Sequence, residues 1–132
     1  MIKKLSLRNL CCGLAVSILM GGAAMASEYN GYVIYNLQAN NSTNVHAKTT
    51  DYDNIENSLV EITGSIQTVD FWTETSGGTD LSYAYAFTPG VKAKMNFKSG
   101  VNKSVGDEIK MTMQNHNYTA HMGTVSGDVD FR

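Results

Sequence analysis

The sequence predicts an all-β domain, a single antiparallel β-sandwich of about eight strands, with a small β-barrel as the alternative. Residues 91–98 and 108–114 alternate between apolar and polar side chains, so each run has one dry face and one wet face. Turn-forming residues recur about every ten residues, which is the spacing of short strands. No run after residue 26 keeps a helical period.

The N-terminal 26 residues have the features of a secretory signal peptide. Three basic residues and no acidic residue precede a short apolar run, and Ala24-Met25-Ala26 offers a small-x-small cleavage site. A membrane anchor is the alternative, but a spanning helix needs about 20 apolar residues and this run is shorter. We therefore expect cleavage after Ala26, export of the chain, and no transmembrane anchor after cleavage.

Removing residues 1–26 from the 132-residue chain leaves a single domain, residues 27–132, which is long enough to bury a core. Both cysteines, Cys11 and Cys12, lie in the signal peptide, so the exported domain has no disulfide and no thiolate metal site. Three of the 10 basic residues lie there too, against none of the 12 acidic residues, so the domain is acidic. This balance lacks the basic signature of nucleic-acid binding.

The first half of the domain supplies four expected strands. Residues 32–39 come first, with Val33, Tyr35 and Leu37 on one face and an asparagine-rich turn at the end. Three more strands follow, each bounded by turn-forming residues, at 45–50, 59–63 and 67–75.

The second half begins after a turn with paired glycines, which supply positive φ. A strand at 81–88 ends at a Pro-Gly pair, and the strands at 91–98 and 108–114 are expected to pair as an antiparallel hairpin. The last strand is expected at 118–131, with a bulge at Gly123, where the apolar phase slips by one residue. The apolar faces predict a core of Val33, Tyr35, Leu37, Val69, Phe71, Val91, Met95, Phe97, Ile109, Met111, Met113, Val125 and Val129.

The expected hairpin places four lysines on one wet face. Lys92, Lys94 and Lys98 alternate along its first strand, and Lys110 faces the same way on the second. Like charges repel, so packing gives no reason to gather them. We expect this face to bind an anionic cell-envelope polymer or an acidic lipid surface. The alternative is that the lysines only confer solubility and protect the edge of the sheet.

Three aromatic residues also share one side of an expected strand. Tyr83, Tyr85 and Phe87 could form a platform for stacking sugars, or they could pack in the core, where aromatic side chains dominate sheet interiors. Core packing is the simpler interpretation, and a carbohydrate-binding platform is the alternative.

Metal ligation and catalysis have little support in the sequence. Residues 51–56 gather oxygen ligands, but they lack the third acidic position and the glycine of a calcium loop, so a solvated loop is expected. His46, His116 and His121 show no zinc spacing. There is no nucleophile elbow, P-loop or dinucleotide-binding glycine pattern. We expect no catalytic residue, no metal and no cofactor.

Four short segments carry a resemblance. Residues 37–40 (Leu-Gln-Ala-Asn), 71–74 (Phe-Trp-Thr-Glu), 115–118 (Asn-His-Asn-Tyr) and 125–128 (Val-Ser-Gly-Asp) resemble small secreted proteins of unknown function from Gram-positive bacteria, the kind grouped as DUF2712. Val129 stands where that family usually has tryptophan. The resemblance implies a secreted single β domain and adds no catalytic residue.

These observations together predict a secreted, non-enzymatic β-sandwich that binds at the cell envelope or outside the cell. A bacteriocin-like antagonist of other cells is one alternative. A small carbohydrate-binding protein or hydrolase that uses Tyr83, Tyr85 and Phe87 is another.

Overall fold

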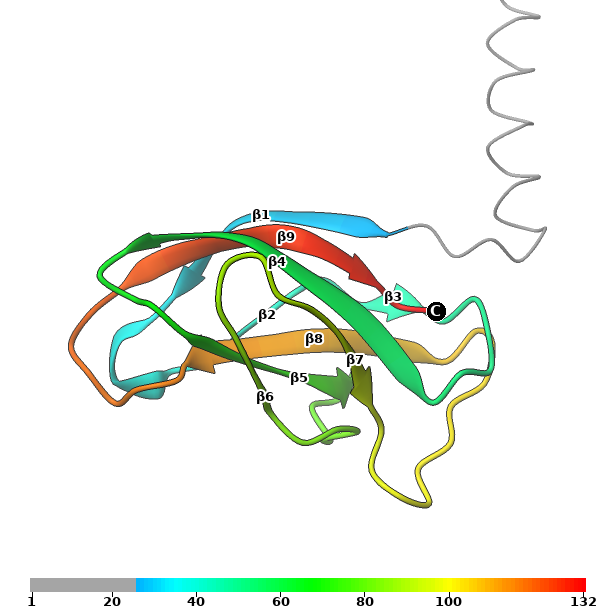
Figure 1. Ribbon diagram of the computed structural model, residues 1–132. Helices are drawn as coiled ribbons and strands as arrows, with labels where there is room; N and C mark the ends of the chain where they lie inside the picture. Colours follow the sequence, from blue (N-terminus) through cyan, green and yellow to red (C-terminus); the bar gives the residue numbers. More distant parts are fainter. Residues whose placement is uncertain (1–25) are drawn as a thin grey trace, which may run out of the picture.

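The computed structural model describes residues 26–132 and shows two antiparallel sheets packed face to face, which confirms the predicted all-β sandwich (Figure 1). All but the last residue of the expected signal peptide lies outside the described residues. Within the part of the chain that the structure describes, no helix is long and apolar enough to cross a membrane.

Sheet A contains four strands and sheet B contains five. Sheet A has the order β1 (Ser27–Ile34), β9 (Gly123–Asp130), β4 (Asn54–Gly64) and β7 (Lys92–Asn96). Sheet B has the order β2 (Asn41–Ser42), β8 (Glu108–Asn115), β5 (Val69–Thr75) and β6 (Tyr85–Phe87), and β3 (His46–Ala47) also pairs with β8. A 3-10 turn, η1 (Asn36–Gln38), separates β1 from β2.

The inner faces of the two sheets form one apolar core, as period-two alternation requires. Nine of the expected core residues are buried, and Val91 packs partly buried against them. The nine are Val69, Phe71, Met95, Phe97, Ile109, Met111, Met113, Val125 and Val129. The core also includes Tyr29, Ile34, Ile55, Leu59, Ile66, Leu81, Phe87 and Phe131.

The expected hairpin of residues 91–98 and 108–114 is wrong. β7 pairs with β4 in sheet A, with Asn57 opposite Ala93, whereas β8 pairs with β5 in sheet B, with Phe71 opposite Met113. Alternation satisfies the inner face of either sheet equally well, so it gives no information about the partner strand. The turn-rich connection crosses between the sheets, which pack about 10 Å apart.

The expected first strand is displaced along the chain. β1 ends at Ile34, and Tyr35 and Leu37 are exposed instead of buried. A bulge between Tyr29 and Tyr32 shifts the register against β9, so that Tyr29 and Ile34 both face the core. The apolar alternation of the residues after the bulge therefore predicted the wrong buried face.

The expected last strand is shorter than predicted. β9 begins at Gly123, so the phase slip there marks the start of a strand and not a bulge inside one. Gly123 lies opposite Gly64 on β4, and a Cβ at residue 123 would overlap the backbone oxygen of Thr63. Glycine is needed here because the two strands approach so closely.

Candidate functional site

The four lysines do not share a face. Lys92 and Lys94 lie on the outer face of β7 in sheet A, whereas Lys110 lies on the outer face of β8 in sheet B, on the other side of the sandwich. Two of the four lysines form ion pairs with glutamates. Lys92 Nζ lies 2.9 Å from Glu56 Oε1, and Lys110 Nζ lies 3.6 Å from Glu74 Oε2. The common lysine face, inferred from the hairpin, is therefore wrong.

The fourth lysine, Lys98, lies with its Nζ 4.9 Å from the centre of the Tyr83 ring. Phe87 is 1% exposed and belongs to the core, and Tyr85 is half-buried with its hydroxyl accepting a hydrogen bond from the Asn96 N–H. Only Tyr83 is open to solvent. These three aromatic residues therefore form no stacking platform. The core-packing interpretation is confirmed for Phe87.

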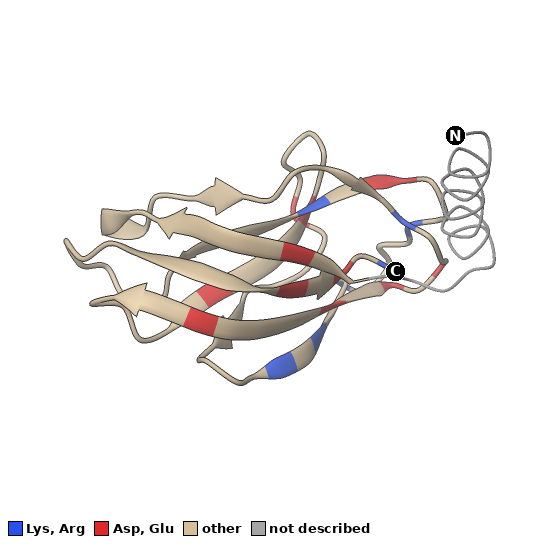
Figure 2. Cartoon of the chain, turned by 90° about the horizontal axis from the view of Figure 1, so that it is seen from above, with Lys and Arg blue, Asp and Glu red and all other residues tan. Residues whose placement is uncertain are grey.

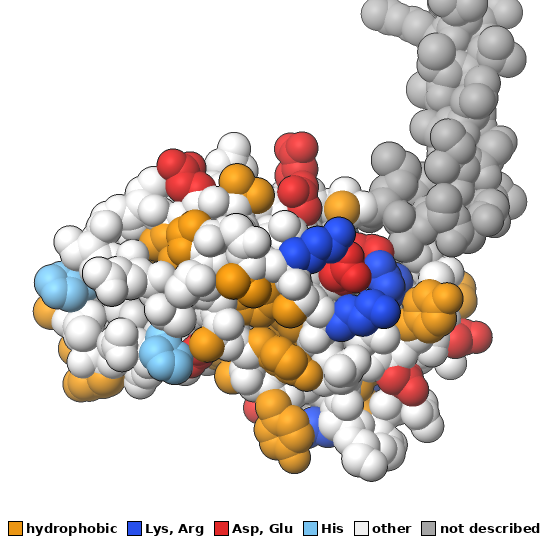
Figure 3. All heavy atoms as spheres, in the orientation of Figure 1, with side chains coloured by type: hydrophobic (Ala, Val, Ile, Leu, Met, Phe, Trp, Pro, Cys, Tyr) orange, Lys and Arg blue, Asp and Glu red, His pale blue; other side chains and the backbone are white. Residues whose placement is uncertain are grey.

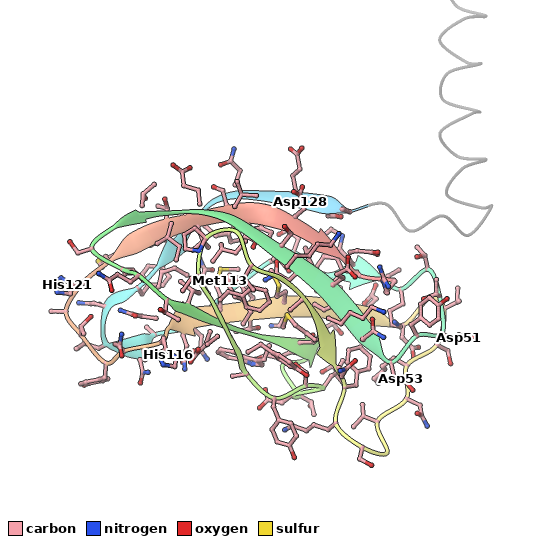
Figure 4. The ribbon with its side chains drawn as sticks, viewed as in Figure 1. Asp51, Asp53, Met113, His116, His121 and Asp128 are labelled. Atoms are coloured by element: carbon pink, nitrogen blue, oxygen red, sulfur yellow. The ribbon has the colours of Figure 1, made fainter. Side chains whose placement is uncertain are left out.

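The acidic residues at 51–56 lie partly in a loop and partly in a strand, because β4 begins at Asn54. The Asp51 carboxylate accepts the Val105 N–H at 2.9 Å, and the Asp53 carboxylate accepts the Lys103 N–H at 3.4 Å. Residues 51–53 are exposed, as expected of a solvated loop, and they also form a docking point for the connection between β7 and β8 (Figure 4). Among residues 26–132, no group of three or more His, Cys, Asp or Glu side chains is arranged to hold a metal ion.

Lys48 lies at the centre of this docking point and is 1% exposed. Its Nζ donates to the backbone oxygens of Tyr52 and Arg132. Burial lowers the pKa of the Lys48 ammonium, while the carboxylates of Asp51, Asp53 and Asp130 act against that shift. The Asp51 and Asp53 carboxylates therefore lie near an internal lysine, whose direct partners are backbone oxygens.

The opposite end of the sandwich is the candidate site, which we call the uncharged end. It consists of three segments, residues 35–41, 63–68 and 115–122, none of which contains Lys, Arg, Asp or Glu (Figure 2). The Leu37 N–H donates to Thr119 O at 2.7 Å, and the His116 N–H donates to Thr68 O at 3.2 Å. These contacts bring the three segments together from distant parts of the chain.

Apolar side chains project from the uncharged end. Tyr118 is 71% exposed and Leu37 is 50% exposed, and Tyr35 and Met122 are exposed as well. Hydrophobic side chains and histidines lie next to one another at this end of the space-filling view (Figure 3). At its border, His116 Nδ1 lies 2.7 Å from Asp70 Oδ1, so the Asp70 carboxylate is engaged by a neighbouring side chain. Exposed apolar groups gathered on loops are typical of an interaction surface.

A hollow of about 160 Å³ lies within the uncharged end. It is lined by Ser65, Ile66, Gln67, Asn115, Asn117, Thr119 and His121. His121 and His116 mark this end in Figure 4. Hydroxyl, amide and imidazole groups supply both hydrogen-bond donors and acceptors without a carboxylate or an ammonium. The arrangement suits a neutral polar ligand.

Sequence reasoning missed this site. The available signal was the absence of charged residues from residues 35–41, 63–68 and 115–122. Each segment alone resembles an ordinary polar turn. Only the strand order, which pairs β1 and β4 with β9, brings them to one end.

Comparisons with known proteins give one result. No family model matches this chain, and no curated protein does. A solved structure described as a carbohydrate-binding module, CBM36, in complex with calcium and xylotriose is similar at a TM-score of 0.43 and 12% identity, over 84% of this chain and 95% of that chain. At that distance the likeness carries no argument about the function of this chain.

Proposed function

We propose that this chain is an exported, non-enzymatic binding module that holds an uncharged polysaccharide of the cell envelope at the uncharged end. The observation that carries the proposal is the grouping of Tyr35, Leu37, Tyr118 and Met122 with neutral hydrogen-bonding groups on segments that lack formal charge. The domain has 12 acidic residues, so a surface free of them is a distinct feature of the molecule.

The chemistry of a neutral sugar matches this surface. A pyranose ring has an apolar face, which can stack on tyrosine, and a rim of hydroxyl groups that pair with amides and hydroxyls. Burying an unpaired charge against such a ligand would be unfavourable, so a charge-free site suits it. The separated and paired lysines give no comparable support to an anionic partner.

The start of β1 lies away from the uncharged end. Ala26 lies beside Asp128 and Asp130, at the end of β1 away from Ile34 and η1 (Figure 1). β1 therefore begins at the end of the sandwich that is opposite the uncharged end.

Cosedimentation tests the proposal, with purified cell envelopes and with insoluble cellulose, xylan, mannan and chitin at low and high salt. We expect binding that persists in high salt, where charge interactions are screened within about 3 Å at 1 M. Tyr118→Ala should weaken it about tenfold, which corresponds to about 1.4 kcal/mol.

Tyr83→Ala is the matched control, because Tyr83 is 70% exposed and Tyr118 is 71% exposed, but Tyr83 lies away from the uncharged end. Equal loss in both variants would contradict the location of the site. Binding that disappears in high salt, or in a variant with Lys92, Lys94, Lys98 and Lys110 all changed to Gln, would favour an anionic ligand instead.

A further inference from the structure

The hollow in the uncharged end has a fixed floor. Asn115 is 3% exposed, and its side chain accepts the Asn117 N–H at 3.0 Å and donates to Thr119 Oγ1 at 3.1 Å. Ile66 is 6% exposed and packs into the core. Because these groups are held by the fold, the shape of the hollow exists before a ligand arrives.

The rim of the hollow is exposed and has free hydrogen-bonding capacity. Ser65, Gln67, Asn117 and His121 are all exposed. Within the described part of the chain, the side-chain amides of Gln67 and Asn117 make no hydrogen bond. Each amide offers both a donor and an acceptor, so the pair can meet the hydroxyl groups of one neutral ring.

The size of the hollow limits what it can hold. Its volume is about 160 Å³, close to that of an engineered cavity of about 150 Å³ that holds a single benzene ring. Pockets for larger ligands measure about 300–1,000 Å³. The hollow lies between the β4–β5 connection and the β8–β9 connection. Its volume leaves room for about one six-membered ring.

We infer that this hollow takes the terminal sugar of a neutral polysaccharide, so that the module recognises chain ends and not chain interiors. The inference rests on the proposed function and names the part of the polymer that is bound. Tyr118, between the lining residues Asn117 and Thr119, offers a face on which the second sugar can stack outside the hollow. Later sugars then lie in solvent and add little affinity.

The test combines two measurements on the exported protein. Calorimetric titration uses the oligosaccharide series, from disaccharide to hexasaccharide, of whichever neutral polysaccharide sediments with the protein. Cosedimentation uses that polysaccharide before and after limited hydrolysis, which multiplies chain ends at constant mass. We expect the affinity to level off by the trisaccharide and the bound amount to rise with the number of chain ends.

Asn117→Ala and Gln67→Ala should each weaken binding about tenfold with an unchanged melting temperature. Asn102→Ala, an exposed asparagine in the β7–β8 connection, is the matched control and should bind normally. Affinity that keeps rising up to the hexasaccharide, or no gain from new ends, would overturn chain-end recognition and leave the proposed function standing. Failure to bind any neutral polysaccharide would overturn both.

Discussion

Leu37 and Gln38 carry an unusual backbone at the centre of the uncharged end. Their φ angles are 55° and 57°, in the left-handed region that residues other than glycine seldom adopt. Such a conformation costs roughly 1–2 kcal/mol per residue. The Leu37 N–H bond to Thr119 O and the Gln38 Nε2 bond to His116 O, 3.0 Å long, hold the turn in place. Local strain kept at a surface turn is a common feature of binding sites.

Two substitutions at this turn separate its strain from its side chain. Leu37→Gly and Leu37→Ala both remove the exposed side chain, but only glycine adopts positive φ freely. We expect the free energy of unfolding, measured by urea denaturation, to be about 1 kcal/mol larger for the glycine variant than for the alanine variant. Both variants should bind polysaccharide less well than wild type. Equal stability of the two would show that residue 37 is not strained.

His46 gives a prediction about pH. Its ring stacks on Phe131, with centroids 4.4 Å apart, and burial lowers the pKa of the imidazole below its ordinary value. In the unfolded chain His46 takes up a proton at about pH 6.5, whereas in the folded chain it does so only at a lower pH. The stability is therefore complete above about pH 6.5 and falls as the pH drops from there through the lower pKa of the folded state. His46→Gln should flatten this loss in melts from neutral to mildly acid pH, and Asn102→Ala, which removes no titratable group, should not. The same loss in both variants would exclude His46 as its source.

At the scale of elements, the sequence gives strand positions better than strand partners. The runs that became β5, β7 and β8 were placed correctly, since their inner faces alternate cleanly. Their pairing could not be read, because alternation fixes which side of a strand is buried and leaves the neighbour open. The prediction for β1 is wrong for a different reason, because a bulge at Gly31 breaks the alternation of buried and exposed residues on which it depends.

Paired cysteines test the strand partners directly, because the described part of the chain contains no cysteine. Ser58 on β4 lies opposite Lys92 on β7, and opposite residues on antiparallel strands have Cα atoms about 4.5–5.5 Å apart, within disulfide reach. The double variant Ser58→Cys, Lys92→Cys should oxidise to a disulfide in air. The variant Lys94→Cys, Lys110→Cys should keep two free thiols when these are counted by mass spectrometry. The reverse result would restore the β7–β8 hairpin.

Lys48 anchors three segments that the sheets do not pair. Its ammonium binds the backbone of Tyr52 and Arg132, and its own backbone exchanges two 2.9 Å hydrogen bonds with Gly106 and Asp107. Without the ammonium the backbone oxygens of Tyr52 and Arg132 lose their donor, and each buried acceptor left unsatisfied costs about 1–3 kcal/mol. We expect that loss for Lys48→Ala in urea denaturation, with faster amide exchange at Gly106.

The control for Lys48 is Lys94→Ala, since Lys94 is exposed on β7 and its removal should change stability by no more than about 0.5 kcal/mol. A Lys48 variant as stable as the Lys94 variant would show that the ammonium does not hold these segments. The sequence showed the carboxylates of this region, but it could not show that they would lie near a buried lysine.

At the scale of the whole molecule, charge is distributed unevenly between the two ends. Lys48, Asp51, Asp53, Asp130 and Arg132 gather at the end where β9 finishes, and the uncharged end lies at the other (Figure 2). The fold class followed from the sequence alone. The candidate site did not, because it is made by three turns whose meeting depends on the order of strands in both sheets.

Chemical-shift mapping by NMR tests the central claim most directly. The protein, labelled with nitrogen-15, is titrated with neutral oligosaccharides, and the shifted amides are located on the fold. We expect shifts confined to the uncharged end, with Leu37, Gln67, Asn117 and Tyr118 among the largest. Shifts centred on the outer strands around Lys92, or none at all with every neutral oligosaccharide, would contradict it.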